Sequence, residues 1–355
     1  MKRKQLISLL LLVCVCAASL MTACNKKQEE KTKYTEHSLD YFDTVTTITG
    51  YEADEETFNR ISAEILTMLG EYHRLFTIYH RFDGMENLCT VNELVDGAHR
   101  TVTVDRKIID LLLYAKEMHQ LTQGKMNVAM GSVLSIWHTY RTEGMDEPWN
   151  AKLPPTELLQ EAAEHTDINH LIVNEQASTV WISDPKMTLD VGAIAKGYAV
   201  EQIARALEQR GITGYVLNVG GNIRTIGTKS NGEKWVAGIT NPDDTSEQAY
   251  VAELLLAGES IVTSGSYQRF YVVGTQSYHH IIDSQTLMPA EGYLSVSIVC
   301  KDSGLGDTLS TALFCMPFEQ GLALIESLPD VEALWILSDQ SQRTSSGFSS
   351  YLKTK

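Results

Sequence analysis

Residues 189–207, with the sequence LDVGAIAKGYAVEQIARAL, join a short predicted strand to a predicted helix. The strand is expected over residues 187–190, and the helical spacing of the later apolar residues predicts a helix that begins near Ala193. The first amides of a helix lack internal partners and carry partial positive charge. A loop that brings Gly192 and Lys196 to this helix start therefore resembles a phosphate-binding site. The alternative is a tight turn with a surface lysine, because the segment matches neither a Walker A loop nor a G-x-G-x-x-G motif.

The rest of the chain mixes predicted strands and helices without a regular strand–helix–strand rhythm. This mixture favours an α+β fold over a doubly wound α/β fold. With no Pro/Gly-rich linker and no internal repeat, we expect a single domain over residues 34–355. Helices are predicted at 61–79, 105–124, from 154, 194–211, 308–316 and 319–328, and strands at 40–51, 171–183 (a hairpin), 214–223, 235–240, 249–256, 270–273, 279–282, 293–299 and 333–337.

The N-terminal segment has the pattern of a bacterial lipoprotein signal. Three basic residues precede an apolar run over residues 6–20, which is too short to cross a membrane comfortably, and Leu-Met-Thr-Ala-Cys follows. We predict a signal peptide at 1–23, a lipidated Cys24 and a flexible polar tether at 24–33, which places the protein on the extracytoplasmic face of the cell membrane. The alternatives are an ordinary signal peptide and a short anchor.

Charge and cysteine content narrow the possible partners. The chain has a formal net charge of −16, so nucleic acid is an unsuitable partner. Beyond Cys24 only Cys89, Cys300 and Cys315 remain, and their wide spacing fits neither a disulfide framework nor a zinc site. We therefore expect three buried, apolar thiols.

Polar residues at the ends of predicted elements form further candidate sites. Asn-Val-Gly-Gly-Asn at 218–222 follows a strand, and its glycines let a backbone approach a ligand closely or simply form a turn. Thr-Ser-Gly-Ser-Tyr at 263–267 precedes the His-His-Ile-Ile-Asp of 279–283. If the latter is a strand, His280 faces the site while Asp283 lies at the strand end; the alternative is a structural histidine.

Asp307 and Thr311 lie four residues apart at the predicted start of a helix, so their oxygens share one face. Oxygen ligands of this kind suit a hard cation such as Mg²⁺. Helix capping by Asp307 is the alternative explanation.

Together these segments resemble one family. DVGAIAKGYAVE, NVGGNI, TSGSYQRF, HHIID and GDTLSTALF occur in the order typical of the ApbE flavin transferases, the FAD:protein FMN transferases, over residues 40–337. The resemblance implies a T-fold-like α+β domain that binds FAD and Mg²⁺. It also implies transfer of FMN to a threonine hydroxyl of an acceptor redox protein, with release of AMP.

The resemblance also implies roles for individual residues. The Ala193 carbonyl, the Asp307 carboxylate and the Thr311 hydroxyl correspond to magnesium ligands, while Ser310 stands where some relatives have a second aspartate. Phe42-Asp43-Thr44 replaces a common Met-Gly-Thr, and Ser284 follows Asp283 where many relatives have proline. The implied FAD contacts are Asp190, Lys196 (to phosphate), Ile282, Lys125, Met126, Asn127, Phe42 and Tyr79.

The expected chemistry is attack of a hydroxyl on the FMN phosphorus. Positioning and electrostatics should dominate such a reaction. A threonine hydroxyl is a weak nucleophile, so we assign His280 as the general base, with Asp283 as its orienting partner or an alternative base. One rival is a magnesium-dependent FAD pyrophosphatase, in which water attacks. Another is a non-catalytic flavin-binding lipoprotein, although storage of a flavin needs no metal on its diphosphate.

Overall fold

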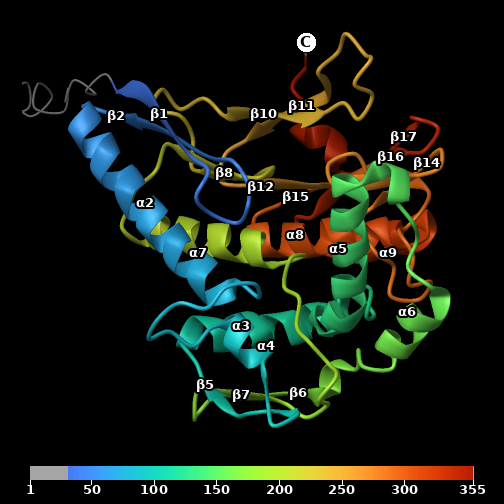
Figure 1. Cartoon of the computed structure of the whole chain (residues 1–355). Coiled ribbons are helices and arrows are strands. Elements are labelled where there is room, and N and C mark those ends of the chain that lie inside the picture. Colours follow the sequence, from blue (N-terminus) through green and yellow to red (C-terminus); the bar gives the residue numbers. More distant parts are fainter. Residues whose placement is uncertain (1–30, 355) are drawn as a thin grey trace, which may run out of the picture.

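The computed structural model describes residues 31–354 and is built on one large antiparallel sheet (Figure 1). Its strands lie in the order β1-β2-β8-β9-β12-β15-β16-β17, and every neighbouring pair is antiparallel. The bounds are β1 Thr32–Ser38, β2 Thr46–Glu52, β8 Tyr215–Val219, β9 Asn222–Ile226, β12 Ser260–Gly265, β15 Tyr293–Cys300, β16 Glu332–Leu337 and β17 Gln342–Thr344.

Helices cover one face of this sheet and build a second layer beyond it. Figure 1 shows α2, α7 and α8 against the sheet and α4 on their far side. The α-helices of the described chain are α2 Glu55–Phe76, α3 Leu88–Val91, α4 Arg106–Leu121, α5 Gly131–Asp146, α6 Thr156–Ala163, α7 Ala195–Gln209, α8 Ser303–Phe314 and α9 Phe318–Glu326.

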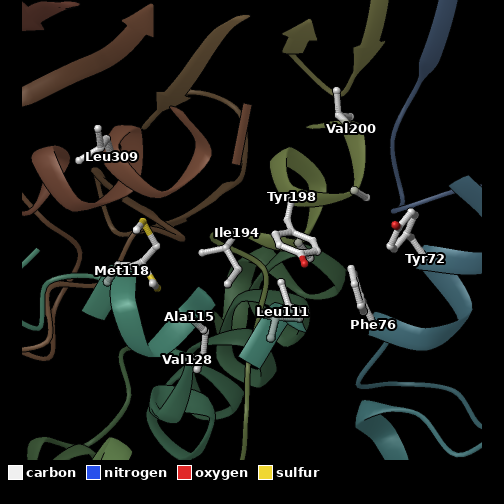
Figure 2. Close-up of a cluster of buried hydrophobic side chains, with 14 of the residues drawn as sticks. Tyr72, Phe76, Leu111, Ala115, Met118, Val128, Ile194, Tyr198, Val200 and Leu309 are labelled. Carbon is white, nitrogen blue, oxygen red and sulfur yellow. The ribbon is translucent and has the colours of Figure 1, made fainter. Parts of the chain in front are cut away.

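The main core is formed by buried side chains of α4, of the sheet-covering helices α2, α7 and α8, and of the large sheet. Figure 2 shows Leu111 and Ala115 of α4 beside Ile194 and Tyr198 at the start of α7, all of them buried. Burial of apolar surface is the main force that holds these layers together. The loop before α7 is therefore held in place, because Ile194 and Tyr198 at the start of α7 are packed in the core.

Four small sheets complete the fold. The β10–β11 hairpin packs its buried Ala237, Ile239 and Leu254 on Ile261 of β12 and Val299 of β15, on the sheet face opposite α7 and α8 (Figure 1). The small sheets are β10 Trp235–Thr240 with β11 Tyr250–Leu256, β13 Phe270–Val273 with β14 Gln276–His279, β3 Leu94–Val95 with β4 Ala98–His99, and β5 Val102–Thr103, β7 Thr179–Ile182 and β6 Leu171–Asn174.

Most predicted elements are present, but several boundaries differ. Residues 187–190 form no strand, because Leu189 N donates to the Asn92 side chain and Asp190 N to the Val128 carbonyl instead of to a ladder. The first predicted strand begins only at Thr46, and α5 and β12 were not predicted. β1 takes in Thr32 and Lys33, the last two residues of the predicted tether, while the signal peptide and Cys24 lie outside the described residues.

Two further observations concern the predicted thiols and the search for helices that could cross a membrane. Cys300 and Cys315 are buried as predicted, whereas Cys89 is half-buried, and all three are free. Between residues 31 and 354, no helix has both the length and the apolar character that crossing a membrane requires.

A buried ion network joins α7, β9 and α8. The Glu201 carboxylate accepts hydrogen bonds from Arg224 Nε at 3.0 Å, Arg205 Nε at 2.8 Å and Ser303 N at 3.0 Å. Burial alone would raise the pKa of Glu201, but Arg224 and these hydrogen bonds lower it below its usual value. The network fixes the two helices that flank the candidate site.

We predict that Arg224→Met lowers the free energy of unfolding by about 3 kcal/mol, because it leaves a buried carboxylate with too few partners. Urea denaturation measures the change. The matched control is Arg60→Met, which removes an exposed ion pair with Glu64 and is expected to cost less than about 1 kcal/mol. Equal stability of the two variants would contradict a structural role for the network.

Candidate active site

A cleft of about 620 Å³ opens where the helix layer meets the ends of β2, β8 and β12. Segments from distant parts of the sequence line it, including α5, the loop before α7, the β8–β9 turn and α8. The structure brings eleven of the predicted site residues together here: Tyr79, Lys125, Met126, Asn127, Asp190, Ala193, Lys196, His280, Ile282, Asp307 and Thr311.

Asp307 lies in the second turn of α8 and does not cap the helix. α8 begins at Ser303, and its N-cap is Asp302, whose side chain accepts from Leu305 N at 3.0 Å. Helix capping, the alternative explanation for an aspartate at position 307, is therefore excluded. Its side chain is nearly fully buried, and Oδ2 accepts from Gly197 N at 2.8 Å and lies 3.8 Å from Lys196 Nζ.

Burial raises the pKa of Asp307, while Lys196 and the Gly197 amide oppose that shift. A buried carboxylate with a single cation nearby binds a second positive charge favourably. Gly197 allows this contact, because a Cβ there would lie 2.3 Å from Ser303 O and 2.5 Å from Asp307 Cβ.

The oxygen set at this end of the cleft fits a magnesium ion. Asp307, Thr311 and Ala193, which can offer a carboxylate, a hydroxyl and a backbone carbonyl oxygen, line the same cleft. Hard cations take oxygen ligands, and Mg²⁺ commonly keeps waters and phosphate oxygens beside one or two carboxylates. Within residues 31–354, no three or more His, Cys, Asp or Glu side chains are grouped so that they could hold a metal ion.

Ser310 does not line the cleft beside this oxygen set. It is fully buried, and its hydroxyl donates to Asp307 O at 3.0 Å and pairs with Ser264 Oγ at 2.8 Å. Ser264 Oγ also lies 3.3 Å from Thr311 Oγ1. Ser310 therefore positions the helix and β12 relative to each other and does not line the cleft.

The loop before α7 supplies one cation and one carboxylate. Asp190 Oδ1 accepts from Gly192 N at 2.8 Å, and Lys196 Nζ lies 3.3 Å from Gly192 O. Burial raises the pKa of Asp190, although the Gly192 amide opposes the shift. The predicted arrangement of glycine and lysine at a helix start is present, with α7 beginning at Ala195.

Two arginines line the same cleft and add positive charge. Arg141 lies on α5, and its Nη2 is 3.0 Å from His138 Nδ1; Arg269 follows β12. Burial, followed by the charge of Arg269, lowers the pKa of Arg141. Sequence reasoning missed Arg141 because it missed α5, whereas Arg269 lies within the quoted TSGSYQRF segment.

His280 lines the cleft as a neutral imidazole. Its Nδ1 lies 3.2 Å from Arg269 O, and since a carbonyl only accepts, Nδ1 carries the proton and Nε2 has a free lone pair. Burial, together with the charges of Arg269 and Arg141, lowers the pKa of His280 to about 3. A base with a free Nε2 is therefore present at neutral pH.

Asp283 does not orient His280, and this prediction was wrong. The Asp283 carboxylate accepts from Lys125 Nζ at 3.1 and 3.2 Å and from Gln285 N at 2.8 Å, and it does not line the cleft. The strand prediction failed here because β14 ends at His279, so side chains no longer alternate as in a strand. Asp283 instead holds Lys125 in place.

Phe42 also lies outside the cleft lining. Its ring packs edge-on against His73 with centroids 5.5 Å apart, and its backbone N donates to His73 Nδ1 at 3.1 Å. The following residues, Asp43 and Thr44, line the cleft in its place. Tyr79 does line the cleft and is exposed, with its ring 5.6 Å from that of His138.

Fold and cleft together define a class of protein: an α+β domain with a cationic, oxygen-rich site at a helix start, suited to a dinucleotide diphosphate. The sequence pattern of the ApbE family matches residues 42–335, so the chain belongs to the ApbE family. The predicted family and the predicted single α+β domain are thereby confirmed.

Curated relatives and solved structures agree. The chain is 30% identical over 276 residues to an FAD:protein FMN transferase of Klebsiella pneumoniae, covering 75% of this chain and 82% of the relative. It is 32% identical over 260 residues to that of Treponema pallidum, covering 69% and 70%. The ApbE protein of Thermotoga maritima superposes with a TM-score of 0.77 at 25% identity, and the flavin transferase ApbE of Vibrio cholerae with 0.73 at 26%; each match covers 91% of this chain and 100% of the other.

Proposed function

We propose that this protein is an FAD:protein FMN transferase that moves FMN from FAD to a threonine hydroxyl of an acceptor redox protein and releases AMP. The buried Asp307 beside Lys196, in a cleft shared with His280, is the observation that carries this proposal. The names of the curated relatives support it.

The cationic side chains of the cleft bind the FAD diphosphate in this proposal. Lys196, Arg141 and Arg269 come from three different segments and line one cleft, so they surround an anion placed there. A magnesium ion held by Ala193 O, Asp307 and Thr311 would neutralise part of the diphosphate charge and polarise its P–O bonds. The chain's own task is to hold the diphosphate still while charge shifts toward the leaving phosphate.

The transfer step forms one bond and breaks one bond. The threonine oxygen bonds to the FMN phosphorus, and the bond from that phosphorus to the bridging oxygen breaks, so the oxygen leaves with AMP. The hydroxyl proton passes to Nε2 of His280, the ring nitrogen that the contact with Arg269 O leaves free. Solvent then takes the proton, and no oxidant or reductant is needed.

One experiment tests this function against both rivals. The protein is incubated with FAD and Mg²⁺, with and without a flavin-free acceptor redox protein, and the products are weighed by mass spectrometry. Transfer predicts an acceptor with FMN on threonine and one equivalent of AMP. AMP with free FMN and no adduct would show a pyrophosphatase, and intact FAD would show a binding protein; either result overturns the proposal.

We further propose that the protein is attached to the extracytoplasmic face of the cell membrane by a lipid on Cys24. The basic, apolar and Leu-Met-Thr-Ala-Cys segments in sequence support this location. Cys24→Ala is expected to abolish incorporation of radiolabelled palmitate into the protein in growing bacterial cells, while Cys89→Ala leaves it unchanged. Equal labelling of the Cys24 variant would contradict the proposal.

A further inference from the structure

A second hollow of about 360 Å³, which we call the threonine groove, continues from the cleft across the sheet. The groove and the cleft share lining residues, so the two hollows adjoin each other. The shared residues are Thr47, Asn218, Gly221, Thr263 and Gln268.

The floor of the threonine groove is the sheet face opposite α7 and α8. Two rows of register partners cross it. The row at the cleft end runs through Thr47, Asn218, Ile223 and Ile261, and the outer row through Thr49, Val216 and Thr225.

The wall of the groove is the edge of β10. Consecutive residues of this strand, Trp235 to Gly238, line the groove. Since neighbouring residues in a strand point to opposite faces, lining by consecutive residues means that the strand edge borders the hollow.

This edge of β10 is free of backbone partners. β10 pairs only with β11, and no other backbone hydrogen bond to Trp235–Thr240 occurs within residues 31–354. The outer edge of β11 is already occupied, because Lys353 N donates to Glu253 O at 2.8 Å and Leu254 bridges to Leu352. An unpaired strand edge is a template for another extended segment.

The chemistry of the groove differs from that of the cleft. No charged residue lines the groove, whereas Lys196, Arg141 and Arg269 line the cleft. The phosphates of a dinucleotide therefore belong in the cleft. Uncharged polar, aliphatic and aromatic side chains beside a free strand edge suit an uncharged, extended peptide.

We propose that the threonine-bearing segment of the acceptor protein binds in the threonine groove as an added strand on the free edge of β10. Its hydroxyl then enters the cleft at the shared row of Thr47 and Asn218. The inference rests on the proposed transferase function and adds where and how the protein substrate docks. Backbone hydrogen bonds to β10 supply affinity, and the small residues Thr47, Gly221 and Thr263, which line both hollows, favour small side chains near the target.

Hydrogen exchange tests the strand addition directly. The probe is an acceptor redox protein that wild-type enzyme flavinylates, with its target threonine changed to valine so that the complex does not turn over. We expect slower exchange of amides in Trp235–Thr240 when this acceptor is added, and no change in β17. A complex that forms without protection of β10 overturns the proposal.

Substitutions in the outer row test the location. Val216→Arg and Thr49→Arg fill the groove from neighbouring strands and lie outside the FAD cleft. Each is expected to raise the KM for the acceptor at least about tenfold while the Kd for FAD stays within about twofold. Thr344→Arg, on the exposed strand β17 at the far end of the sheet, is the matched control and should behave as wild type.

The outcomes separate the two proposals. If wild type forms no FMN adduct, the transferase function itself fails. If wild type transfers FMN and both arginine variants match it, the docking site is wrong. If the variants instead weaken FAD binding, the groove belongs to the nucleotide, which also overturns the proposal.

Discussion

Asp307→Asn is expected to reduce FMN transfer at least about a thousandfold while the protein stays folded. The substitution removes the only carboxylate of the proposed magnesium set, and a thousandfold loss corresponds to about 4 kcal/mol of transition-state stabilisation. If the amide oxygen takes the place of Oδ2, it keeps the bond from Gly197 N and lies beside Lys196, and the NH₂ group takes the place of Oδ1, where it offers no charge to a cation. Covalent flavin fluorescence of the denatured acceptor measures transfer, and calorimetry measures Mg²⁺ binding.

Asp302→Asn is the matched control for this prediction. It makes the same chemical change on the same helix, at a residue that caps α8, and asparagine caps a helix about as well as aspartate. Transfer is expected to stay within about twofold of wild type. An Asp307→Asn enzyme with more than about a tenth of wild-type transfer would rule out the assigned role.

His280→Ala is expected to slow transfer by about a hundredfold to ten-thousandfold, the usual contribution of a general base. FAD binding should change little, because the imidazole is neutral. Since the lowered pKa of about 3 keeps the free enzyme's imidazole unprotonated, the ratio of wild-type to variant kcat/KM should be the same at pH 6 and pH 8. Rapid-quench measurement of FMN transfer at saturating FAD isolates the chemical step.

His280→Asn distinguishes catalysis from positioning. Its side-chain amide replaces the Nδ1–H that contacts Arg269 O but provides nothing at Nε2. If His280 acts as the base, the asparagine variant is as slow as the alanine variant. Recovery of most of the wild-type rate by asparagine would show that the residue only holds Arg269 and its loop.

The local signals in the sequence predicted much of the fold and the site. Asp105 as an N-cap was correct, because its side chain bonds to Lys107 N, and the loop before α7 was located through its glycine and lysine. The features that the sequence pattern did not predict depend on tertiary contacts. Leu189 N donates to the Asn92 side chain and Asp190 N to the Val128 carbonyl, so residues 187–190 join no sheet. β14 ends at His279, so His280 and Asp283 do not lie on one strand.

Residues without a local pattern were also missed. Arg141 lines the cleft only because α5, the helix that carries it, packs beside the cleft. Nothing near Arg141 in the sequence marks it as a site residue. The threonine groove depends on strand order and on which edge of β10 remains unpaired. Both are properties of the assembled sheet, so a linear pattern cannot contain them.

The contact of α7 with α8 at Gly197 affects how the enzyme binds its ligands. With no side chain between the two backbones, the Lys196 loop and Asp307 are held together by direct packing and by the bond from Gly197 N, although Gly197 and Asp307 are 110 positions apart in the sequence. The conformational entropy of these residues is therefore lost during folding and not during binding. FAD then binds to charged groups that are already in position. Such a site needs no hinge to assemble it, and motion can be confined to the surface loops that admit the protein substrate.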